Sequence, residues 1–189
     1  MTIQHKLITN ADLHEPKGVS AASNKTVYVA NGSGSGAWST LATDSLALPK
    51  GKFYFYNTGS PYTLAHSAST AKVAPTTVAS GYGSLVTEAT TARLTYTGAA
   101  TTVVKLDFDV SIKQASGADR DILISVHRNG TVIPGSQVLV TSVTGNLHQA
   151  AGSCLFNTAT NDYFEIYAQN TGASGDMVFQ KVGLTLTAT

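Results

Sequence analysis

The sequence predicts an all-β protein, folded as an antiparallel sandwich or barrel. The 189-residue chain contains 26 Thr, 24 Ala, 18 Ser and 17 Gly, so close to half of its side chains are small. Thr, Ser and Gly are poor helix formers, whereas Thr and Val favour strands. From Lys52 onward, apolar residues recur with a period of two in about eight segments separated by turn residues, which is typical of an antiparallel sandwich.

The first 48 residues are predicted to form an extended arm with a small hairpin. Thr26–Ala30 and Ala37–Leu41 flank the turn residues Asn31–Gly36, a pattern typical of a hairpin. An isolated two-stranded hairpin is barely stable in water, so we expect this segment to order by packing on another surface.

Residues 49–189 are predicted to form the sandwich domain. Thr102 to Lys113 shows the clearest alternation, with the apolar residues Val104, Leu106, Phe108, Val110 and Ile112 on one face. Further strands are expected at Asp121–Arg128, Thr131–Ile133, Gln137–Ser142, Ser153–Phe156, Asp162–Gln169 and Met177–Thr187. Asn129-Gly130 predicts a tight turn. Between Tyr62 and Glu88 the pattern is weak, and Pro75 within Lys72–Val78 suits an edge strand or a bulge.

The low charge excludes several classes of partner. The net charge is +1 without a run of Lys or Arg, so we expect no nucleic-acid partner and no binding to anionic membranes. No stretch approaches the roughly 18 consecutive apolar residues that span a bilayer, and we expect no membrane insertion. Met1 to Lys6 is not followed by the apolar core of a signal peptide, so secretion by that route is not expected.

Few residues are suited to catalysis or to metal binding. The five histidines show no metal-binding spacing, and the single Cys154 is expected to be a small buried hydrophobe. Asp107 and Asp109, like Asp119 and Asp121, lie two apart and could bind Ca²⁺ or act as acid and base. Lys105 and Lys113 flank the first pair, and Arg120 and Arg128 lie near the second, so we favour cross-strand charge pairing. The sequence thus predicts no catalytic site, no metal and no cofactor.

The C-terminal half resembles the C1q/TNF-like jelly roll found in many phage structural proteins. The resemblance covers roughly residues 50–189, with the Asn129-Gly130 turn after a long strand pair and the aromatic–aliphatic strand Asp162–Tyr167. It implies a jelly roll that assembles as a homotrimer.

The N-terminal segment is similar to the leaders of tailed-bacteriophage virion proteins, among them head fibres, capsid decoration proteins and some tail fibres. The similarity is carried by Asp12–Ser20, Val27–Gly32 and Gly34–Trp38. It implies a virion component, assembled in the host cytoplasm, whose arm binds the major capsid protein or another virion protein. The attachment residues are then expected to be Leu13, His14, Glu15, Pro16, Lys17, Gly18, Tyr28 and Trp38.

One strand is expected to supply a subunit contact. In Asp162–Gln169, alternation places Phe164, Ile166 and Ala168 in the core and turns Tyr163, Glu165 and Tyr167 outward. Two outward tyrosines suit a subunit interface, where the ring is buried and the hydroxyl finds a partner. The alternative is that both are ordinary surface residues.

The leading hypothesis is a trimeric capsid decoration or head-fibre protein. The alternative is a short tail-fibre or tail-tip protein that binds a host-surface receptor or glycan, with stacking surfaces from Trp38, Tyr54, Tyr56, Tyr62 and Tyr82. A weaker alternative is a polysaccharide depolymerase, which would need Asp107 and Asp109 in a groove.

Overall fold

The computed structural model describes residues 26–30, 36–40, 47–76, 78–81, 83–89, 91–117, 119–172 and 175–189. The chain divides into two compact units between Leu46 and Ala47. None of the described residues belongs to a helix that could cross a membrane. The predicted division of roles between residues 1–48 and 49–189 stays a prediction.

The described part of the first unit is the predicted hairpin. Strand β1 (Thr26–Ala30) pairs antiparallel with β2 (Gly36–Thr40), from Thr26 opposite Thr40 to Ala30 opposite Gly36. Val27 and Val29 are 39% and 51% exposed. The hairpin therefore leaves apolar side chains uncovered within its own unit.

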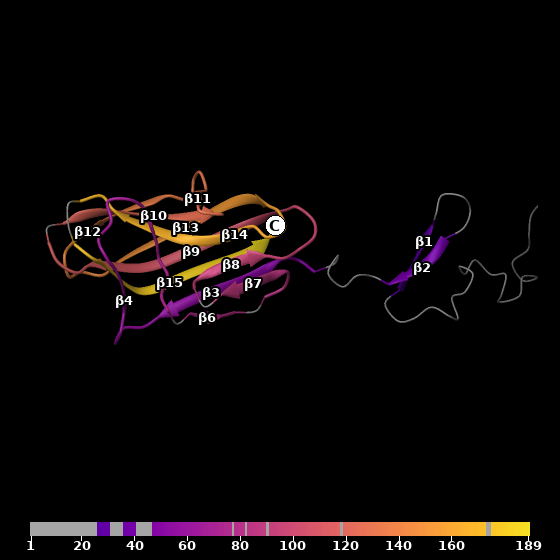
Figure 1. Cartoon of the computed structure of the whole chain (residues 1–189), viewed down its shortest axis with the longest axis horizontal. Helices are drawn as coiled ribbons and strands as arrows, with labels where there is room; N and C mark the ends of the chain where they lie inside the picture. The colour runs from indigo at the N-terminus through magenta and orange to yellow at the C-terminus, as the bar shows by residue number, and fades with distance from the viewer. Residues whose placement is uncertain are drawn as a thin grey trace, which may run out of the picture. The chain divides into compact units, whose positions relative to one another are not determined.

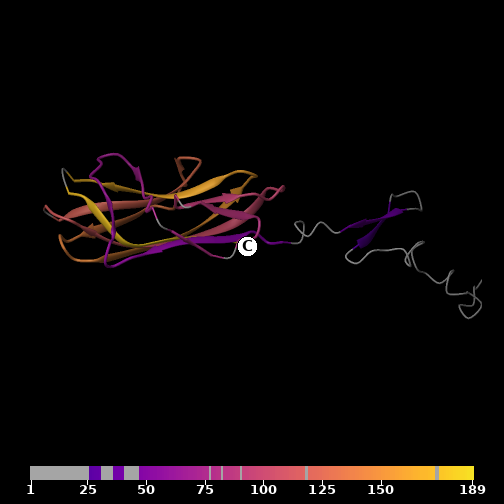
Figure 2. The same ribbon diagram turned by 60° about the horizontal axis from the view of Figure 1, so that its bottom comes forward.

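The second unit is a sandwich of two antiparallel sheets (Figures 1 and 2). In the seven-stranded sheet the order is β11-β10-β14-β8-β7, with β12 on β10 and β5 on β14. Its strands are β5 (Ala71–Lys72), β7 (Val86–Ala89), β8 (Arg93–Tyr96), β10 (Arg120–Arg128), β11 (Thr131–Val132), β12 (Val138–Ser142) and β14 (Tyr163–Asn170).

In the six-stranded sheet the order is β13-β9-β15-β3-β6, with β4 on β15. Its strands are β3 (Lys50–Tyr56), β4 (Tyr62–Leu64), β6 (Ala79–Ser80), β9 (Thr102–Gln114), β13 (His148–Thr158) and β15 (Met177–Ala188). The predicted all-β antiparallel sandwich is confirmed.

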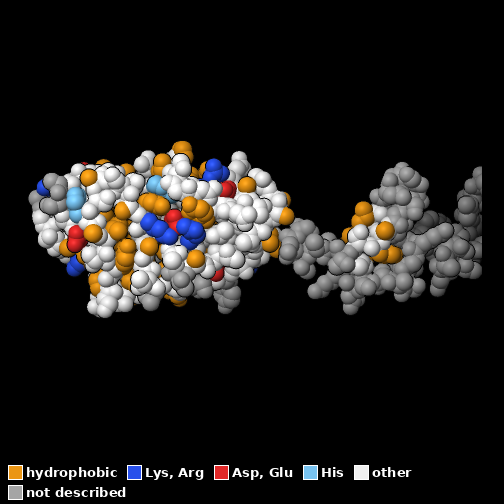
Figure 3. Space-filling model, viewed as in Figure 1, with side chains coloured by type: hydrophobic (Ala, Val, Ile, Leu, Met, Phe, Trp, Pro, Cys, Tyr) orange, Lys and Arg blue, Asp and Glu red, His pale blue; other side chains and the backbone are white. Residues whose placement is uncertain are grey.

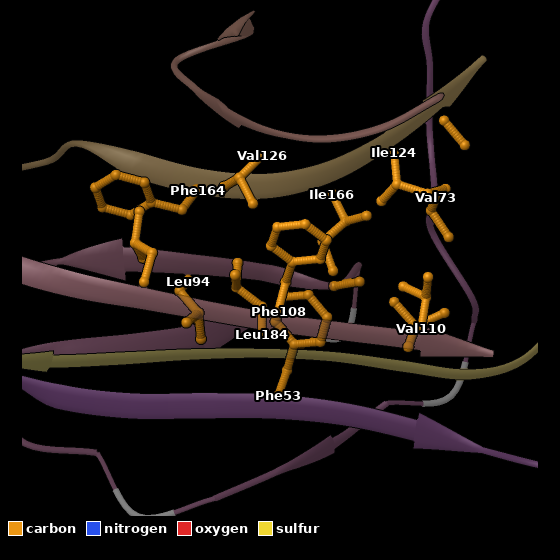
Figure 4. Packing of buried hydrophobic residues seen from close by; sticks show 14 of the residues in the cluster. Phe53, Val73, Leu94, Phe108, Val110, Ile124, Val126, Phe164, Ile166 and Leu184 are labelled. Carbon is orange, nitrogen blue, oxygen red and sulfur yellow. The ribbon is translucent and has the colours of Figure 1, made fainter. Parts of the chain in front are cut away.

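The core lies between the inward faces of the two sheets. Phe53, Phe108 and Leu184 of the six-stranded sheet pack toward Phe164 and Ile166 of the other (Figure 4). The inward set predicted for β9 is confirmed, since Val104, Leu106, Phe108, Val110 and Ile112 are all at most 2% exposed. Burial of these alternating residues fixes the register, because a shift by one residue would turn every one of them outward.

Residues 57–76, here called the strap, connect the two sheets. β4 within the strap pairs with β15 of the six-stranded sheet, and β5 pairs with β14 of the seven-stranded sheet. Val73 is fully buried, and its N–H donates to the carbonyl oxygen of Ile166 at 2.9 Å. The predicted edge strand or bulge at Lys72–Val78 is wrong in extent, because among the described residues of this segment β5 ends at Lys72 and Val73 adds one further hydrogen bond to β14.

The predicted Asn129-Gly130 turn is present and uses left-handed backbone at both residues. Asn129 has φ 51° and Gly130 has φ 81°, which suits the tight connection of β10 to β11.

We expect Gly130→Ala to lower the free energy of unfolding by about 1 kcal/mol, because alanine is strained at this φ. Urea denaturation would measure the change. Gly59→Ala is the matched control, since Gly59 has no positive φ and an added Cβ would meet only the Asn57 side chain at 3.8 Å; an equal loss in both variants would contradict the prediction.

Candidate interaction surfaces

The outward face of β14 carries a buried charge network centred on Glu165. Its side chain is 2% exposed, although it points away from the core. Lys72 Nζ lies 2.5 Å from Glu165 Oε1, and Arg93 Nε lies 2.7 Å from the same oxygen. β5 and β8 both pair with β14, and this pairing places Lys72 and Arg93 beside the carboxylate.

The aromatic rings of Tyr163 and Tyr167 stack on neighbours of this network. The Tyr167 ring stacks on His127 with centroids 3.9 Å apart, and the Arg93 guanidinium lies over the Tyr163 ring at 4.0 Å. The Tyr167 hydroxyl donates to Glu165 Oε2 at 3.4 Å. The rings thus cover a carboxylate that alternation alone would leave in water.

Hydrogen bonds at both ring nitrogens hold His127 in place. Its Nδ1 lies 3.0 Å from the carbonyl oxygen of Gly130, and its Nε2 lies 3.1 Å from Ser125 Oγ. Because a carbonyl oxygen only accepts, Nδ1 donates to Gly130, and Nε2 forms the second hydrogen bond with the serine hydroxyl. The ring is therefore a fixed platform for Tyr167.

The network sets the charge of its members. Burial raises the pKa of Glu165, but hydrogen bonds and charges from Lys72 and Arg93 outweigh it and hold the pKa below its usual range. Burial, with the nearby Glu165 charge, raises the pKa of the Tyr167 hydroxyl. At neutral pH Glu165 is therefore ionised and Tyr167 is protonated. The carboxylate forms ion pairs with Lys72 and Arg93 and accepts a hydrogen bond from Tyr167.

This arrangement corrects part of the prediction for β14. Phe164, Ile166 and Ala168 are fully buried in the core, as expected. Glu165, expected to be exposed, is covered within its own chain, and Tyr163 and Tyr167 are partly buried. Sequence reasoning missed Lys72, Arg93 and His127. They are cross-strand neighbours of β14, and the register that brings them there cannot be read from the sequence alone. A subunit contact at Tyr163, Glu165 and Tyr167 stays a prediction.

The aspartate pairs are structural and differ from each other. Lys105 Nζ lies 2.8 Å from Asp107 Oδ1 on the same strand, so this residue is charge-paired but not across strands. Asp109 is paired across strands, with Lys181 of β15 and not with Lys113. The expectation for Asp119 and Asp121 is wrong. Their carboxylates accept from the Thr144 N–H at 3.2 Å and the Thr141 hydroxyl at 2.7 Å, while Arg128 pairs with Asp162 at 3.5 Å.

Cys154 is a half-buried residue on β13 that packs against the hydrophobic core. Burial raises the pKa of its thiol, and the charge of Asp107 adds to this. The thiol is therefore protonated at neutral pH, which suits the predicted role of a small hydrophobe better than that of a nucleophile.

The outward face of the six-stranded sheet exposes large apolar side chains. Tyr54 and Tyr56 of β3 are 46% and 69% exposed, and Leu155 of β13 is 65% exposed. Figure 3 shows one side of the molecule, on which several groups of charged side chains lie among hydrophobic and uncharged ones. The same outward face carries the exposed Lys105–Asp107 and Lys181–Asp109 ion pairs, so a subunit that covered the tyrosines would have to leave these charges at the rim or pair them.

The predicted attachment residues are only partly within the described structure. Leu13, His14, Glu15, Pro16, Lys17 and Gly18 lie outside the described residues, as does Tyr82. Tyr28 and Trp38 occupy opposite positions in the β1–β2 ladder, and Trp38 is partly buried.

The two packed antiparallel sheets define a C1q/TNF-like jelly roll, and comparison with solved structures agrees. Eiger TNF from S. frugiperda matches with a TM-score of 0.51 and 14% identity, over 75% of this chain and 92% of that one. PRD1 vertex protein P5 matches with a TM-score of 0.50 and 13% identity, over 74% and 96%. The globular domain of zebrafish complement 1qA has a TM-score of 0.49 and 11% identity, over 75% and 96%.

Sequence comparison adds no relative. No protein-family model matches the chain, and a search of curated proteins finds no match. At identities of 14% or less the structural likeness shows the fold, and function rests on the surfaces described above.

Proposed function

We propose that this chain is a structural protein of a bacteriophage virion, a trimeric decoration or head-fibre protein whose N-terminal arm binds the capsid. The observation that carries the proposal is the β1–β2 hairpin. It has five residues in each strand and leaves Val27 and Val29 exposed, so it is too small to be stable without a further partner. A capsid surface would cover these side chains.

The second unit supports a structural role. Its fold is shared with PRD1 vertex protein P5, and the family that the sequence resembles is usually trimeric. The carboxylates of Asp107 and Asp109, which a hydrolase could use, are each paired with a lysine. A jelly roll with a low surface charge and exposed tyrosines suits packing against copies of itself.

Removal of residues 1–46 should abolish capsid binding and leave a folded, soluble protein. Residues 47–189 form a compact unit with its own core, so they do not need the arm to fold. Three arms on one trimer bind together, and their joint affinity exceeds that of one arm by roughly 10²-fold or more. Occupancy on capsids that lack the protein, measured by cosedimentation, would show the loss.

A matched pair of point variants tests the hairpin itself. Val27→Asp with Val29→Asp should reduce occupancy, whereas Val132→Asp should not, since Val132 is similarly exposed at 37% but lies in the second unit. Full occupancy by the truncated protein would contradict arm attachment. Gold-labelled antibodies on intact virions would separate the head from the alternative, a tail-fibre or tail-tip protein that binds a receptor.

A further inference from the structure

A hollow of about 370 Å³ opens between the two limbs of the strap. The outgoing limb runs from the end of β3 into β4, and the returning limb follows β5. The volume lies within the range of sites that hold small ligands, roughly 300–1,000 Å³. The hollow is separate from the Glu165 network and from the hairpin, since it includes no residue of either.

Ring-bearing side chains form the apolar part of the hollow. They are Phe55, Pro61, Tyr62 and Pro75. Phe55 and Pro75 are buried and therefore fixed, and the Tyr62 ring packs on Phe179 with centroids 6.2 Å apart. Flat, rigid apolar surfaces of this kind contact the C–H face of a ring-shaped ligand at little cost in side-chain entropy.

Uncharged hydrogen-bonding side chains form the remainder of the lining. They are Asn57, Ser60, Thr63 and Thr76. Three of them carry hydroxyls and are exposed, so each offers both a donor and an acceptor. Asn57 Oδ1 accepts from the N–H groups of Gly59 at 3.1 Å and Ser60 at 2.8 Å, which fixes the turn before a ligand arrives.

We propose that this hollow binds an uncharged sugar residue, such as one unit of a surface polysaccharide. A pyranose combines an apolar C–H face with a rim of hydroxyls, and the lining matches both with rings and hydroxyls. No Lys, Arg, Asp or Glu lines the hollow, so an acidic sugar would find no compensating charge. A purely aliphatic ligand would leave the hydroxyls and the amide without partners. The inference does not depend on where in the virion the protein lies.

The strap gives the hollow a rigid frame. The outgoing limb contains β4, which pairs with β15, and the returning limb begins after β5, which pairs with β14, so the sandwich holds the strap at two places. Between them, Gln169 Nε2 donates to the carbonyl oxygen of Ala68 at 2.5 Å, and the His66 N–H donates to Asp176 Oδ1 at 2.9 Å. A preformed site avoids the entropy cost of ordering a loop on binding.

Saturation-transfer NMR with the 189-residue chain would detect the binding. The probes are glucose, galactose, mannose and N-acetylglucosamine, with glucuronic acid and a proline-rich peptide as competing classes. We expect at least one neutral sugar to bind, with a dissociation constant on the order of 1 mM because one ring makes few contacts. Ser60→Trp should fill the hollow and weaken binding at least tenfold, and Thr76→Val should weaken it about threefold through a lost hydrogen bond.

Two variants serve as controls. Ser69→Trp adds the same side chain at an exposed strap position outside the hollow, and Thr95→Val makes the same exchange on β8; both should bind as the parent does. Unchanged binding in Ser60→Trp, absence of binding by every neutral sugar, or preference for glucuronic acid or the peptide would overturn the proposal. Retained chemical-shift dispersion in each variant shows that a loss does not come from unfolding.

Discussion

Replacing Glu165 with glutamine will lower the free energy of unfolding by about 2 kcal/mol at pH 7. The substitution keeps the volume of the side chain but removes the charge that Lys72 and Arg93 share, and it leaves both cations beside a neutral amide. Removing one partner of a fully buried ion pair costs about 3–5 kcal/mol. Lys72 and Arg93 are 24% and 38% exposed and can turn toward water, which reduces the cost. Urea denaturation, followed by far-UV circular dichroism of the backbone, would measure the loss in free energy of unfolding.

The matched control is Asp107→Asn on the other sheet. Asp107 also pairs with a lysine, at 2.8 Å, but its side chain is 40% exposed. An exposed pair contributes roughly 0–1 kcal/mol. Equal losses in the two variants would show that burial under the tyrosines adds nothing to the Glu165 ion pairs.

The effect of Glu165→Gln will depend on pH in a defined direction. The pKa of Glu165 in the folded protein lies below its value in the unfolded chain, about 4.3. The carboxylate therefore stabilises the fold at pH values above that unfolded pKa, and the stabilisation is lost as the pH falls through the folded pKa. The difference in stability between the parent and the variant should therefore shrink as the pH falls below about 4.3. A difference that does not shrink on acidification would show a cause other than the charge.

Period-two alternation could predict the fold because the core strands are regular. β9, β10 and β14 place apolar side chains inward at every second residue, and that pattern can be recognised without knowing the neighbours. β13 could not be bounded in this way. It runs from His148 to Thr158, but the inward position 152 is a glycine, which interrupts the alternation of apolar residues. A larger residue would not fit there, since a Cβ would lie 2.5 Å from the Phe108 ring.

The strap and the Glu165 network depend on pairings that are distant in sequence. β5 has two residues and no alternation of its own, so nothing in the sequence indicates that it pairs with β14. Burial of Glu165 follows from Lys72 and Arg93, which lie 93 and 72 residues away along the chain. Alternation correctly turned Glu165 away from the core, but it could not show that neighbouring side chains cover the outward face. The same limit hid the strap hollow.

The choice between the two candidate subunit contacts can be made with two double variants. Tyr54→Ser with Tyr56→Ser should dissociate the proposed trimer into monomers at micromolar concentration. Both rings are exposed in the single chain, so their removal leaves the fold intact. Buried tyrosines at the centre of an interface often contribute about 2 kcal/mol each, and a trimer loses that contribution at three contacts. Sedimentation velocity would measure the change in mass.

Tyr163→Ser with Tyr167→Ser is the opposing variant, and it tests the contact that the sequence predicts. These rings already have partners within the chain, Arg93 at 4.0 Å and His127 at 3.9 Å. We therefore expect this variant to lose stability but to remain trimeric. If it dissociates while the Tyr54 and Tyr56 variant stays trimeric, the subunits meet through the seven-stranded sheet, and the Glu165 network lies inside the interface. If neither variant dissociates, the subunits of the proposed trimer meet through neither of these two faces. The exposed tyrosines would then be available to a different partner.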